Sequence, residues 1–257
     1  MTSPKLSAIL ITLNEAHNLA DCLSSLQGLV DEIILVDNGS RDATLEIAQR
    51  CNARIVRTDD WPGFGPQKNR ALDAATGEWV LSIDADERVT PELAEEIRTV
   101  IASNEACAYE IPRLSWYCGR FMRHSGWYPD PVLRLFRRGQ GRFTDDLVHE
   151  RLVTHDAMRR LRHHLLHYSF MNFSQVLEKV DRYSTASAQQ RFARGRRATP
   201  WGAALRGLWA FVRTYVLRRG FLDGPQGFAS AVSNAQGSYY RYLNLWFMGR
   251  GSMMRLW

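Results

Sequence analysis

Polar side chains able to bind a charged ligand stand at the ends of three apolar runs, over residues 6–13, 32–38 and 78–84. In chain order they are Thr12, Asn14, Glu15, Asp37, Asp84 and Asp86. Crowded carboxylates either raise one another's pKa or attract a cation. Magnesium or manganese held by one or two carboxylates completes its shell with water and phosphate oxygens. The pattern therefore predicts a site for a nucleoside diphosphate with a divalent metal. The alternative is that these aspartates cap the helices that follow them.

The apolar runs belong to a pattern of strands alternating with helices. Strands are predicted over 6–13, 32–38, 53–58 and 78–84, and helices over 19–26, 42–50, 66–75 and 91–103, with Ser40 or Asp42 capping the second helix and Thr90 the fourth. This alternation predicts a parallel sheet covered on both faces, whose ligands bind at the carboxyl ends of the strands. Further strands are expected over 109–117 and 131–138, and helices over 172–194 and 201–219.

Other nucleotide-binding classes with a similar sheet lack their motifs here. The first strand ends in T-L-N-E, without the G-x-G-x-x-G of dinucleotide dehydrogenases, and G-x-x-x-x-G-K-[ST] is absent. A phosphatase would carry its D-x-D after the first strand, and a nucleotidyl transferase would need a Gly-rich basic loop there. The four cysteines have no C-x-x-C spacing, which predicts neither a zinc finger nor a disulfide framework.

Four ordered sequence pieces resemble the family two glycosyltransferases, which have the GT-A fold. They are T-L-N-E (12–15), V-D-N-G-S-R-D (36–42), Q-K-N-R-A-L (67–72) and D-A-D-E (84–87). Asn38 departs from the pattern, since the family often has a second aspartate there. The chain is most similar to the lipopolysaccharide core β-1,4-glucosyltransferase branch, again at R-L-F-R-R (134–138), D-D-L-V-H-E-R-L (145–152) and G-F-L-D-G-P-Q-G-F (220–228). The resemblance implies a Rossmann-like nucleotide-sugar domain over 1–160 and a mostly helical, basic extension over 161–257.

The resemblance also implies a role for each matched residue. Lys68 and Arg70 would counter the charge of the nucleotide, although a solvated helix face is the alternative for both. Asp84 would meet the ribose or the metal, and Asp86 would hold the Mg²⁺ or Mn²⁺ that bridges the diphosphate. The remaining nucleotide-binding positions would be Thr12, Asn14, Glu15, Asp37 and Ala85.

An inverting transfer needs a carboxylate base for the acceptor hydroxyl, and the strand-end carboxylates are engaged with nucleotide. The remaining dense acidic group is Asp145, Asp146 and Glu150. Glu150 is preferred because it lies where the family's acidic residue falls, and Asp146 and Asp145 remain as alternatives. Glu150 could instead form an ordinary salt bridge with Arg151 or Arg134. A zinc site at His163 and His167 is not favoured, because no fitting cysteine or carboxylate completes it.

The charge of the chain is unevenly distributed. Residues 1–150 carry 16 basic and 23 acidic side chains, whereas residues 151–257 carry 17 and 4. In the second part, Leu205, Leu208, Trp209, Val212 and Val216 share one face of a predicted helix over 201–219. Apolar residues opposite arginines fit a helix lying in a membrane interface, although packing on the catalytic domain is the alternative.

The resemblance, together with the basic region, predicts a metal-dependent inverting glycosyltransferase that moves a sugar onto a lipid-linked or lipopolysaccharide acceptor, and the resemblance to the branch favours UDP-glucose as donor. We expect a cytoplasmic enzyme, peripheral on the inner face of the membrane, with no nucleic-acid partner. The alternative is a non-enzymatic module that binds anionic lipid or nucleic acid through the basic region.

Overall fold

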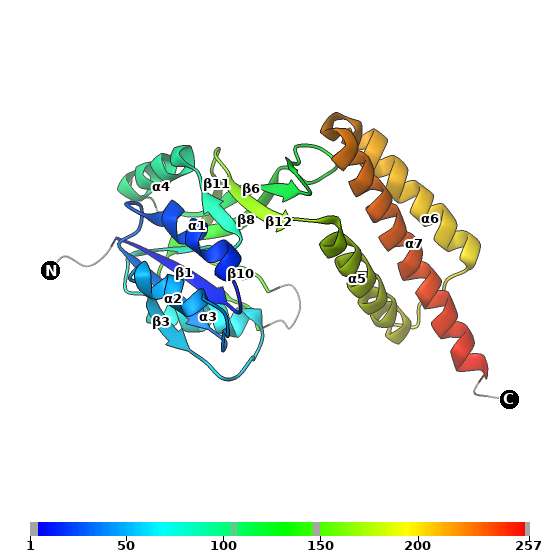
Figure 1. The fold of residues 1–257 in the computed structure, drawn as a ribbon, viewed down its shortest axis with the longest axis horizontal. Coiled ribbons are helices and arrows are strands. Elements are labelled where there is room, and N and C mark those ends of the chain that lie inside the picture. Colours follow the sequence, from blue (N-terminus) through cyan, green and yellow to red (C-terminus); the bar gives the residue numbers. More distant parts are fainter. Residues whose placement is uncertain (1–4, 104, 106, 146–149, 255–257) are drawn as a thin grey trace. The chain divides into compact units, whose positions relative to one another are not determined.

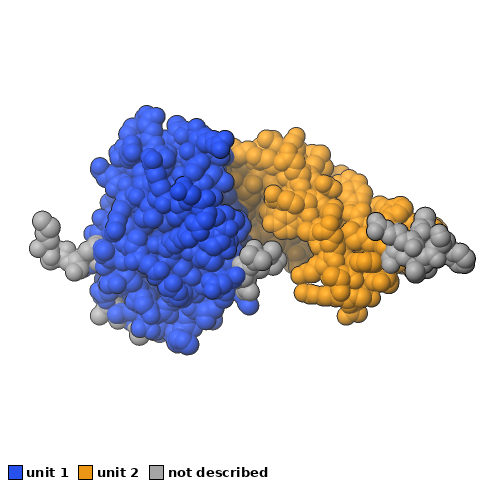
Figure 2. Space-filling model, turned by 90° about the horizontal axis from the view of Figure 1, so that it is seen from below, with its two compact units in different colours: residues 1–113, 130–167 blue, residues 114–129, 168–257 orange. Residues whose placement is uncertain are grey.

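The computed structural model describes residues 5–103, 105, 107–145 and 150–254, with side chains up to residue 250. The chain forms two compact units (Figure 2), which we call unit 1 (residues 1–113 and 130–167) and unit 2 (residues 114–129 and 168–257). These units differ in extent from the expected domains at 1–160 and 161–257. Residues 114–129 group with unit 2, and residues 161–167 group with unit 1.

Unit 1 alternates strands and helices as the sequence predicts. Its first elements are β1 (Leu6–Thr12), α1 (Ala16–Leu26), β2 (Glu32–Asp37), α2 (Thr44–Arg50), β3 (Arg54–Arg57), α3 (Phe64–Ala74), β4 (Trp79–Ser82), β5 (Glu87–Val89) and α4 (Pro91–Ser103). The elements that follow are β6 (Cys107–Tyr117), which continues into unit 2, β8 (Asp130–Arg137), β9 (Gly141–Phe143), β10 (Leu152–Thr154), β11 (Ala157–Arg160) and β12 (Leu165–Phe170). The sequence pattern did not predict β5 or β9 to β12.

The main sheet has the strand order β3-β2-β1-β4-β8-β6-β12-β5 (Figure 1). Its first four strands are parallel, and β8 joins β4 in the antiparallel direction. In this register Thr12 lies beside Asp37, so β1 and β2 end at the same edge. The sheet is therefore mixed, with a parallel half that brings the predicted site residues to one edge.

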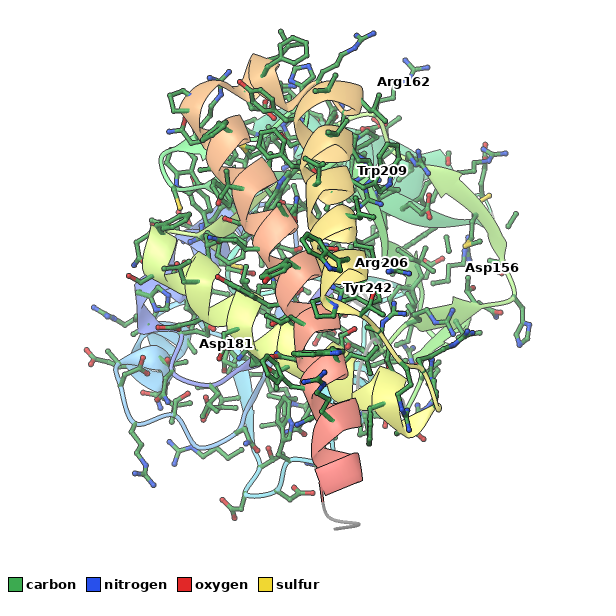
Figure 3. The ribbon with its side chains drawn as sticks, turned by 90° about the vertical axis from the view of Figure 1, so that its right-hand side faces the viewer. Asp156, Arg162, Asp181, Arg206, Trp209 and Tyr242 are labelled. Atoms are coloured by element: carbon green, nitrogen blue, oxygen red, sulfur yellow. The ribbon has the colours of Figure 1, made fainter. Side chains whose placement is uncertain are left out.

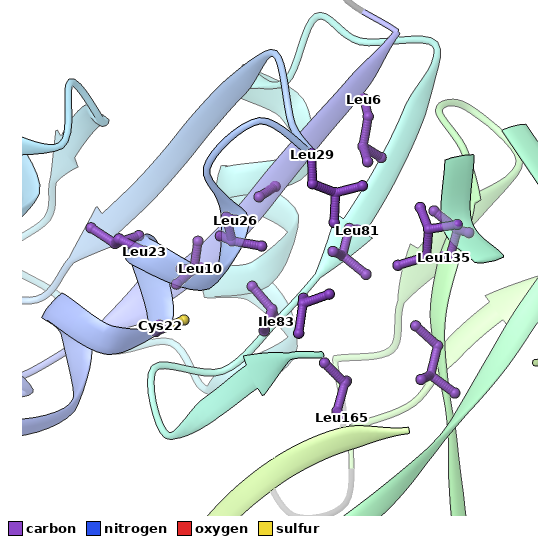
Figure 4. Close-up of a cluster of buried hydrophobic side chains, with 14 of the residues drawn as sticks. Leu6, Leu10, Cys22, Leu23, Leu26, Leu29, Leu81, Ile83, Leu135 and Leu165 are labelled. Atoms are coloured by element: carbon purple, nitrogen blue, oxygen red, sulfur yellow. The ribbon is translucent and has the colours of Figure 1, made fainter. Parts of the chain in front are cut away.

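Both faces of the central parallel strands β1 and β4 are buried, as a doubly covered sheet requires, whereas the edge strand β3 is partly exposed. Leu6, Ala8 and Leu10 of β1 belong to one apolar cluster together with Leu23 of α1 (Figure 4). Ile9 points to the opposite face and joins the second cluster, which α3 completes. This alternation along β1 follows from the period of two in a strand.

Of the predicted caps, Thr90 and Asp42 each accept a hydrogen bond from an amide at a helix start, whereas Ser40 does not. The Thr90 hydroxyl accepts a hydrogen bond from the Leu93 amide at the start of α4, as expected. The N-cap of α2 is Ala43, which makes no side-chain hydrogen bond. Ser40 is instead turned toward Asp37 and the Asn14 amide, and Asp42 accepts from the Ala16 and Thr44 amides. These two side chains therefore connect the loops after β1 and β2.

Unit 2 is mostly helical. It contains β7 (Arg120–Phe121), α5 (Phe173–Ala193), α6 (Pro200–Val212), a π-helical turn η1 (Arg213–Leu217), a 3₁₀ turn η2 (Gly220–Asp223) and the long α7 (Gly224–Met254). The helices α6 and α7 run side by side (Figure 1). Gly207 permits this approach, because a Cβ there would lie 3.2 Å from the Ala235 carbonyl oxygen. Among the described residues, no helix is long and apolar enough to cross a membrane.

Candidate active site

Asp37 lies at the carboxyl end of β2 and is completely buried. Its Oδ1 accepts hydrogen bonds from the Gly39 and Ser40 amides at 3.0 and 2.9 Å, and the Thr12 hydroxyl donates to Oδ2 at 3.1 Å. Asn14, in the left-handed region with φ 56°, accepts from the Arg41 amide through its side chain. Thr12, Asn14 and Asp37 thus shape the loops at the sheet edge.

A cavity of about 350 Å³ opens beside these loops, and we call it the aromatic cavity. Trp61 and Phe64 form one wall, with ring centroids 4.9 Å apart in an edge-to-face arrangement. The other residues that line it are Ile11, Thr12, Leu13, Glu15 and Asn38. The sequence reasoning missed both rings, although two aromatic residues around the Gly63 turn were a usable signal. Such rings offer flat apolar surfaces on which a nucleobase can stack.

A second cavity of about 250 Å³ shares Ile11, Glu15 and Phe64 with the aromatic cavity, and we call it the acidic cavity. Its other lining residues are Lys68, Asp84, Ala85, Asp86, Glu150 and His167. Burial raises the pKa of Glu15, and the charge of Asp86 adds to this effect against a hydrogen bond from Asn18. Strand ends and a later loop therefore meet in one acidic recess, as the sequence predicts for Glu15, Lys68 and residues 84–86.

Asp84 is held between two cations. Its Oδ1 lies 3.2 Å from Lys68 Nζ, and its Oδ2 accepts from Arg134 Nη2 at 2.5 Å. Burial by itself would raise the pKa of Asp84, but Arg134 and Lys68 outweigh it and hold that pKa well below its ordinary value. Arg134 also pairs with the fully buried Glu87, at 2.7 Å. Asp84 is therefore ionised, and both of its oxygens are engaged by protein cations.

Glu150 lies in the acidic cavity, where its Oε1 is 3.2 Å from Lys68 Nζ. Among the described residues its ion-pair partner is thus Lys68, rather than the Arg151 or Arg134 expected as alternatives from the sequence. Asp145 is exposed and does not line the cavity, and Asp146 lies outside the described residues. Glu150 is therefore the base candidate that faces the recess in the part of the chain that the structure describes.

Asp86 pairs with His167 of β12, with 3.3 Å between Oδ2 and Nε2. No specific role for His167 could be predicted, because its position depends on the long-range pairing of β12 with β5, where His167 lies opposite Glu87. Among the described residues, no group of three or more His, Cys, Asp or Glu side chains could hold a metal alone. The Asp86 carboxylate suits a Mg²⁺ or Mn²⁺ ion whose other ligands are phosphate oxygens and water, and the neighbouring imidazole suits a transition metal such as Mn²⁺ rather than Mg²⁺. These two residues fit a metal that arrives with its nucleotide.

Arg70 does not line either cavity. Its guanidinium forms two hydrogen bonds with Asp60, at 2.8 and 2.7 Å, and a third with the Gln67 side chain. Gln67 in turn donates to Thr58 and Asn38. Arg70 thus braces the 58–61 loop that carries Trp61, rather than facing a ligand directly.

The mixed sheet, with two adjoining cavities at the carboxyl ends of its parallel strands, defines an α/β protein with the Rossmann-like GT-A architecture. The family model described as "Glycosyl transferase family 2" matches residues 7–164. The chain therefore belongs to glycosyl transferase family 2, as the sequence motifs predict.

Named relatives match almost the whole chain. A lipopolysaccharide core biosynthesis glycosyltransferase, LpsC of Rhizobium meliloti, is 31% identical over 243 residues, which are 90% of this chain and 87% of LpsC. An uncharacterized glycosyltransferase of Rickettsia typhi is 29% identical over 255 residues, 94% of this chain and 86% of the relative.

A similar fold is found in a solved structure. TarS of S. aureus, crystallised as residues 1–349 with UDP, matches 93% of this chain and 91% of its own at 17% identity, with a TM-score of 0.50. The similarity extends over both units of the chain. At this identity it supports the fold alone.

Proposed function

We propose that this family two glycosyltransferase inverts the anomeric centre of a sugar, taken from UDP-glucose, as it transfers that sugar to a lipopolysaccharide-core or other lipid-linked glycan. The observation that carries the proposal is the acidic cavity, in which Asp86 and Glu150 both line the recess beside the aromatic cavity. A donor with its base against Trp61 and its diphosphate near Asp86 would present its sugar to Glu150.

The position of Glu150 in the acidic cavity supports its proposed role as the general base. In an inverting displacement, the acceptor oxygen bonds to the anomeric carbon as the bond from that carbon to the diphosphate oxygen breaks, and the acceptor proton leaves to a base. Glu150 would take that proton on a carboxylate oxygen. Lys68 Nζ, 3.2 Å from Glu150 Oε1, holds one oxygen of the carboxylate and so fixes where the carboxylate points.

Asp86 and His167 would hold the proposed metal, which would supply positive charge for the departing diphosphate. Asp84, already bound by Lys68 and Arg134, is better suited to orient Lys68 and to meet the ribose than to act as a ligand. The structure therefore favours Asp86 over Asp84 among the two metal candidates.

The lipid-linked acceptor and a position on the inner face of the membrane are supported by α6. Its small residues, Ala203, Gly207 and Ala210, are buried, whereas Leu205, Leu208 and Trp209 are more than half exposed. Figure 3 labels Trp209 and Arg206 on this helix. Bulky apolar side chains turned outward beside arginines are typical of helices that lie in a lipid interface.

The base assignment is tested with Glu150→Gln, which keeps the shape of the side chain and removes its basicity. We expect transfer to fall by about 10²–10⁴-fold, the usual contribution of a general base, with UDP affinity nearly unchanged. The measurement is product formation from UDP-glucose and a core-oligosaccharide acceptor, with the product's anomeric configuration read by NMR.

Asp145→Asn is the matched control for this test, since it removes a nearby carboxylate that is exposed and does not line the cavity. Its transfer rate should equal that of the wild type. Full activity in Glu150→Gln would refute the base assignment, and a retained anomeric configuration would refute inversion.

A further inference from the structure

Unit 2 contains a cavity of about 330 Å³ that the proposed transfer reaction does not use, and we call it the helical cavity. It lies among α5, α6, η1, α7 and the end of β6, all within unit 2. The residues that line it are Tyr117, Trp127, Phe170, Val176, Lys179, Val180, Tyr183, Ser184, Ala210, Arg213, Ser230, Ser233, Asn234, Gly237, Ser238 and Arg241. Its volume is at the lower end of the range for small-molecule sites.

One part of the helical cavity is apolar and rigidly packed. The Tyr117 ring lies edge-to-face with Trp127 and Phe170, at centroid distances of 5.4 and 5.8 Å. The polar atoms of two of these rings are already paired, because Trp127 Nε1 donates to Ser230 Oγ and Tyr117 bonds with Ser233. With Val176 completing the cluster, this part offers hydrocarbon surface to a ligand.

The other part is cationic, and no acidic residue is among the described residues that line the cavity. Arg213 and Arg241 supply its guanidinium groups, while Lys179 lies over the Phe170 and Tyr183 rings. Unit 2 as a whole has 15 Lys and Arg against three acidic residues. Of those three acidic residues, Asp223 accepts hydrogen bonds from the Arg123 and His124 amides and from the Ser125 hydroxyl.

Arg241 carries a buried donor that lacks a protein partner. Its Nε is shielded from solvent and forms no hydrogen bond within the described structure. A shielded guanidinium donor without an acceptor is unfavourable unless water or an anion supplies one, and an anion also compensates the charge. Arg213 stands exposed on the same cavity, where two guanidinium groups can grip a phosphate with several N–H donors.

We propose that the helical cavity binds a lipid that carries a phosphate monoester, with the phosphate held by Arg213 and Arg241 and the first part of the acyl chain lying against Trp127, Phe170 and Val176. This lipid site is separate from the nucleotide site of unit 1. It extends the proposed function, since it would give the lipid-linked acceptor or its surrounding lipid a defined anchor on the enzyme.

The test titrates the full chain by calorimetry with monomeric dihexanoyl phosphatidic acid, dihexanoyl phosphatidylcholine and inorganic phosphate. We expect phosphatidic acid to bind at one saturable site, with at least about tenfold higher affinity than either of the other two probes. Equal binding of inorganic phosphate would show that the apolar part is unused. If phosphatidylcholine bound as tightly as phosphatidic acid, the phosphate monoester of phosphatidic acid would not be what the site recognises. Either result would overturn the proposal.

Variants locate the binding within the helical cavity. Arg213→Gln and Arg241→Gln should each weaken phosphatidic acid binding at least about tenfold, whereas Arg196→Gln, which removes the same charge from an exposed site outside the cavity, should change it less than about twofold. An equal loss in Arg196→Gln would assign binding to general surface charge and overturn the proposal.

Gly237→Leu fills the cavity without changing any charge. A Cβ at Gly237 meets only Val180 Cγ1, at an ordinary 3.7 Å, and leucine favours a helix, so this variant should fold and lose lipid binding. Retained binding in Gly237→Leu would place the lipid elsewhere and refute the proposal. UDP titration of the same samples keeps the two proposals apart, because lost lipid binding with intact UDP binding leaves the nucleotide site standing.

Discussion

Lys68 is the residue on which the charge balance of the acidic cavity depends. It is 8% exposed, and its Nζ lies 3.2 Å from both Asp84 Oδ1 and Glu150 Oε1. Such a buried cation is stable only because two carboxylates compensate its desolvation. The same contacts place a proposed base and a strand-end aspartate at fixed positions, so that one helix residue organises the site.

Asp86 has the clearest predicted role at this scale, since it lines the acidic cavity and, unlike Asp84, forms no ion pair with a Lys or Arg among the described residues. We expect Asp86→Ala to lower transfer by more than about a hundredfold with every sugar nucleotide, because charge stabilisation worth several kcal/mol is lost. Transfer rates after chelation and re-addition of Mg²⁺ or Mn²⁺ measure this. Asp73→Ala, an exposed carboxylate paired with Arg142, is the control and should keep its metal response.

If the wild type is equally active after chelation, or if Asp86→Ala keeps its activity, the metal assignment is wrong. The sequence could indicate Asp86 because its spacing from a buried strand is local. It could not indicate His167 as its neighbour, because they are brought together by an antiparallel pairing between distant segments.

At the scale of elements, α3 and the segment after β9 meet at Gly65. A Cβ there would lie 1.8 Å from the Thr144 carbonyl oxygen and 3.5 Å from Glu150 Cβ. Gly65→Ala must therefore displace the chain that leads to Glu150, although alanine by itself favours a helix. We expect kcat to fall by about a hundredfold, the cost of misplacing a reacting group by about 1 Å, with a smaller change in UDP affinity.

Steady-state kinetics measure the change in kcat, and titration with UDP measures the change in UDP affinity. Gly249→Ala is the control, because the added methyl group meets only the flexible Arg197 side chain. Equal kcat in Gly65→Ala and the wild type would mean that the position of Glu150 does not matter, and would count against its role as base.

Glu32, at the start of β2, joins this strand to β1 and to the loop before β4 through hydrogen bonds. Burial would raise the pKa of Glu32, but hydrogen bonds from Ser7, Thr76 and Gly77 outweigh it and hold that pKa below its ordinary value. A carboxyl whose folded pKa is depressed stabilises the fold above its unfolded pKa of about 4.3, and the effect is lost as pH falls through the folded pKa. We expect Glu32→Gln to lower the free energy of unfolding by about 1 kcal/mol at neutral pH.

Urea unfolding of Glu32→Gln and the wild type measures this difference, which should shrink as the pH is lowered below about 4. Glu46→Gln, which removes an exposed partner of Arg50, should cost much less at any pH. A difference for Glu32→Gln that stays constant down to low pH would contradict the ionic origin of the effect.

The elements differ in how far their sequence reveals them. The run 6–12 is continuously apolar, and α1 repeats Leu19, Cys22 and Leu26 at helical spacing, so both were predicted near their observed bounds. The helix α7 was not predicted, because it packs through small residues such as Ala231 and Ser233, which leave little apolar periodicity. The short strands β9 to β11 depend on pairings that local patterns do not encode.

At the scale of the whole molecule, the chain combines an acidic-site unit with a basic helical unit. In unit 2, the Arg206 guanidinium lies over the Tyr242 ring at 4.3 Å, between α6 and α7 (Figure 3). This contact draws a cation toward the helix pair, while Leu205 and Leu208 stay exposed. The expected amphipathic face of this region therefore exists, with its bulky residues turned outward in the described structure of unit 2.

The outward face predicts the last result, on membrane binding. Leu205→Glu with Leu208→Glu should reduce the fraction bound to phosphatidylglycerol vesicles at least about tenfold, because two buried contacts with the lipid interface are replaced by charges that anionic lipid repels. Both positions are solvent-exposed within unit 2, so the melting temperature should hardly change. Val153→Glu with Met158→Glu makes the same change at exposed apolar sites of unit 1 and should leave vesicle binding within about twofold. Co-sedimentation at low and high salt measures both pairs, and an equal loss in the two would reduce the membrane proposal to net charge alone.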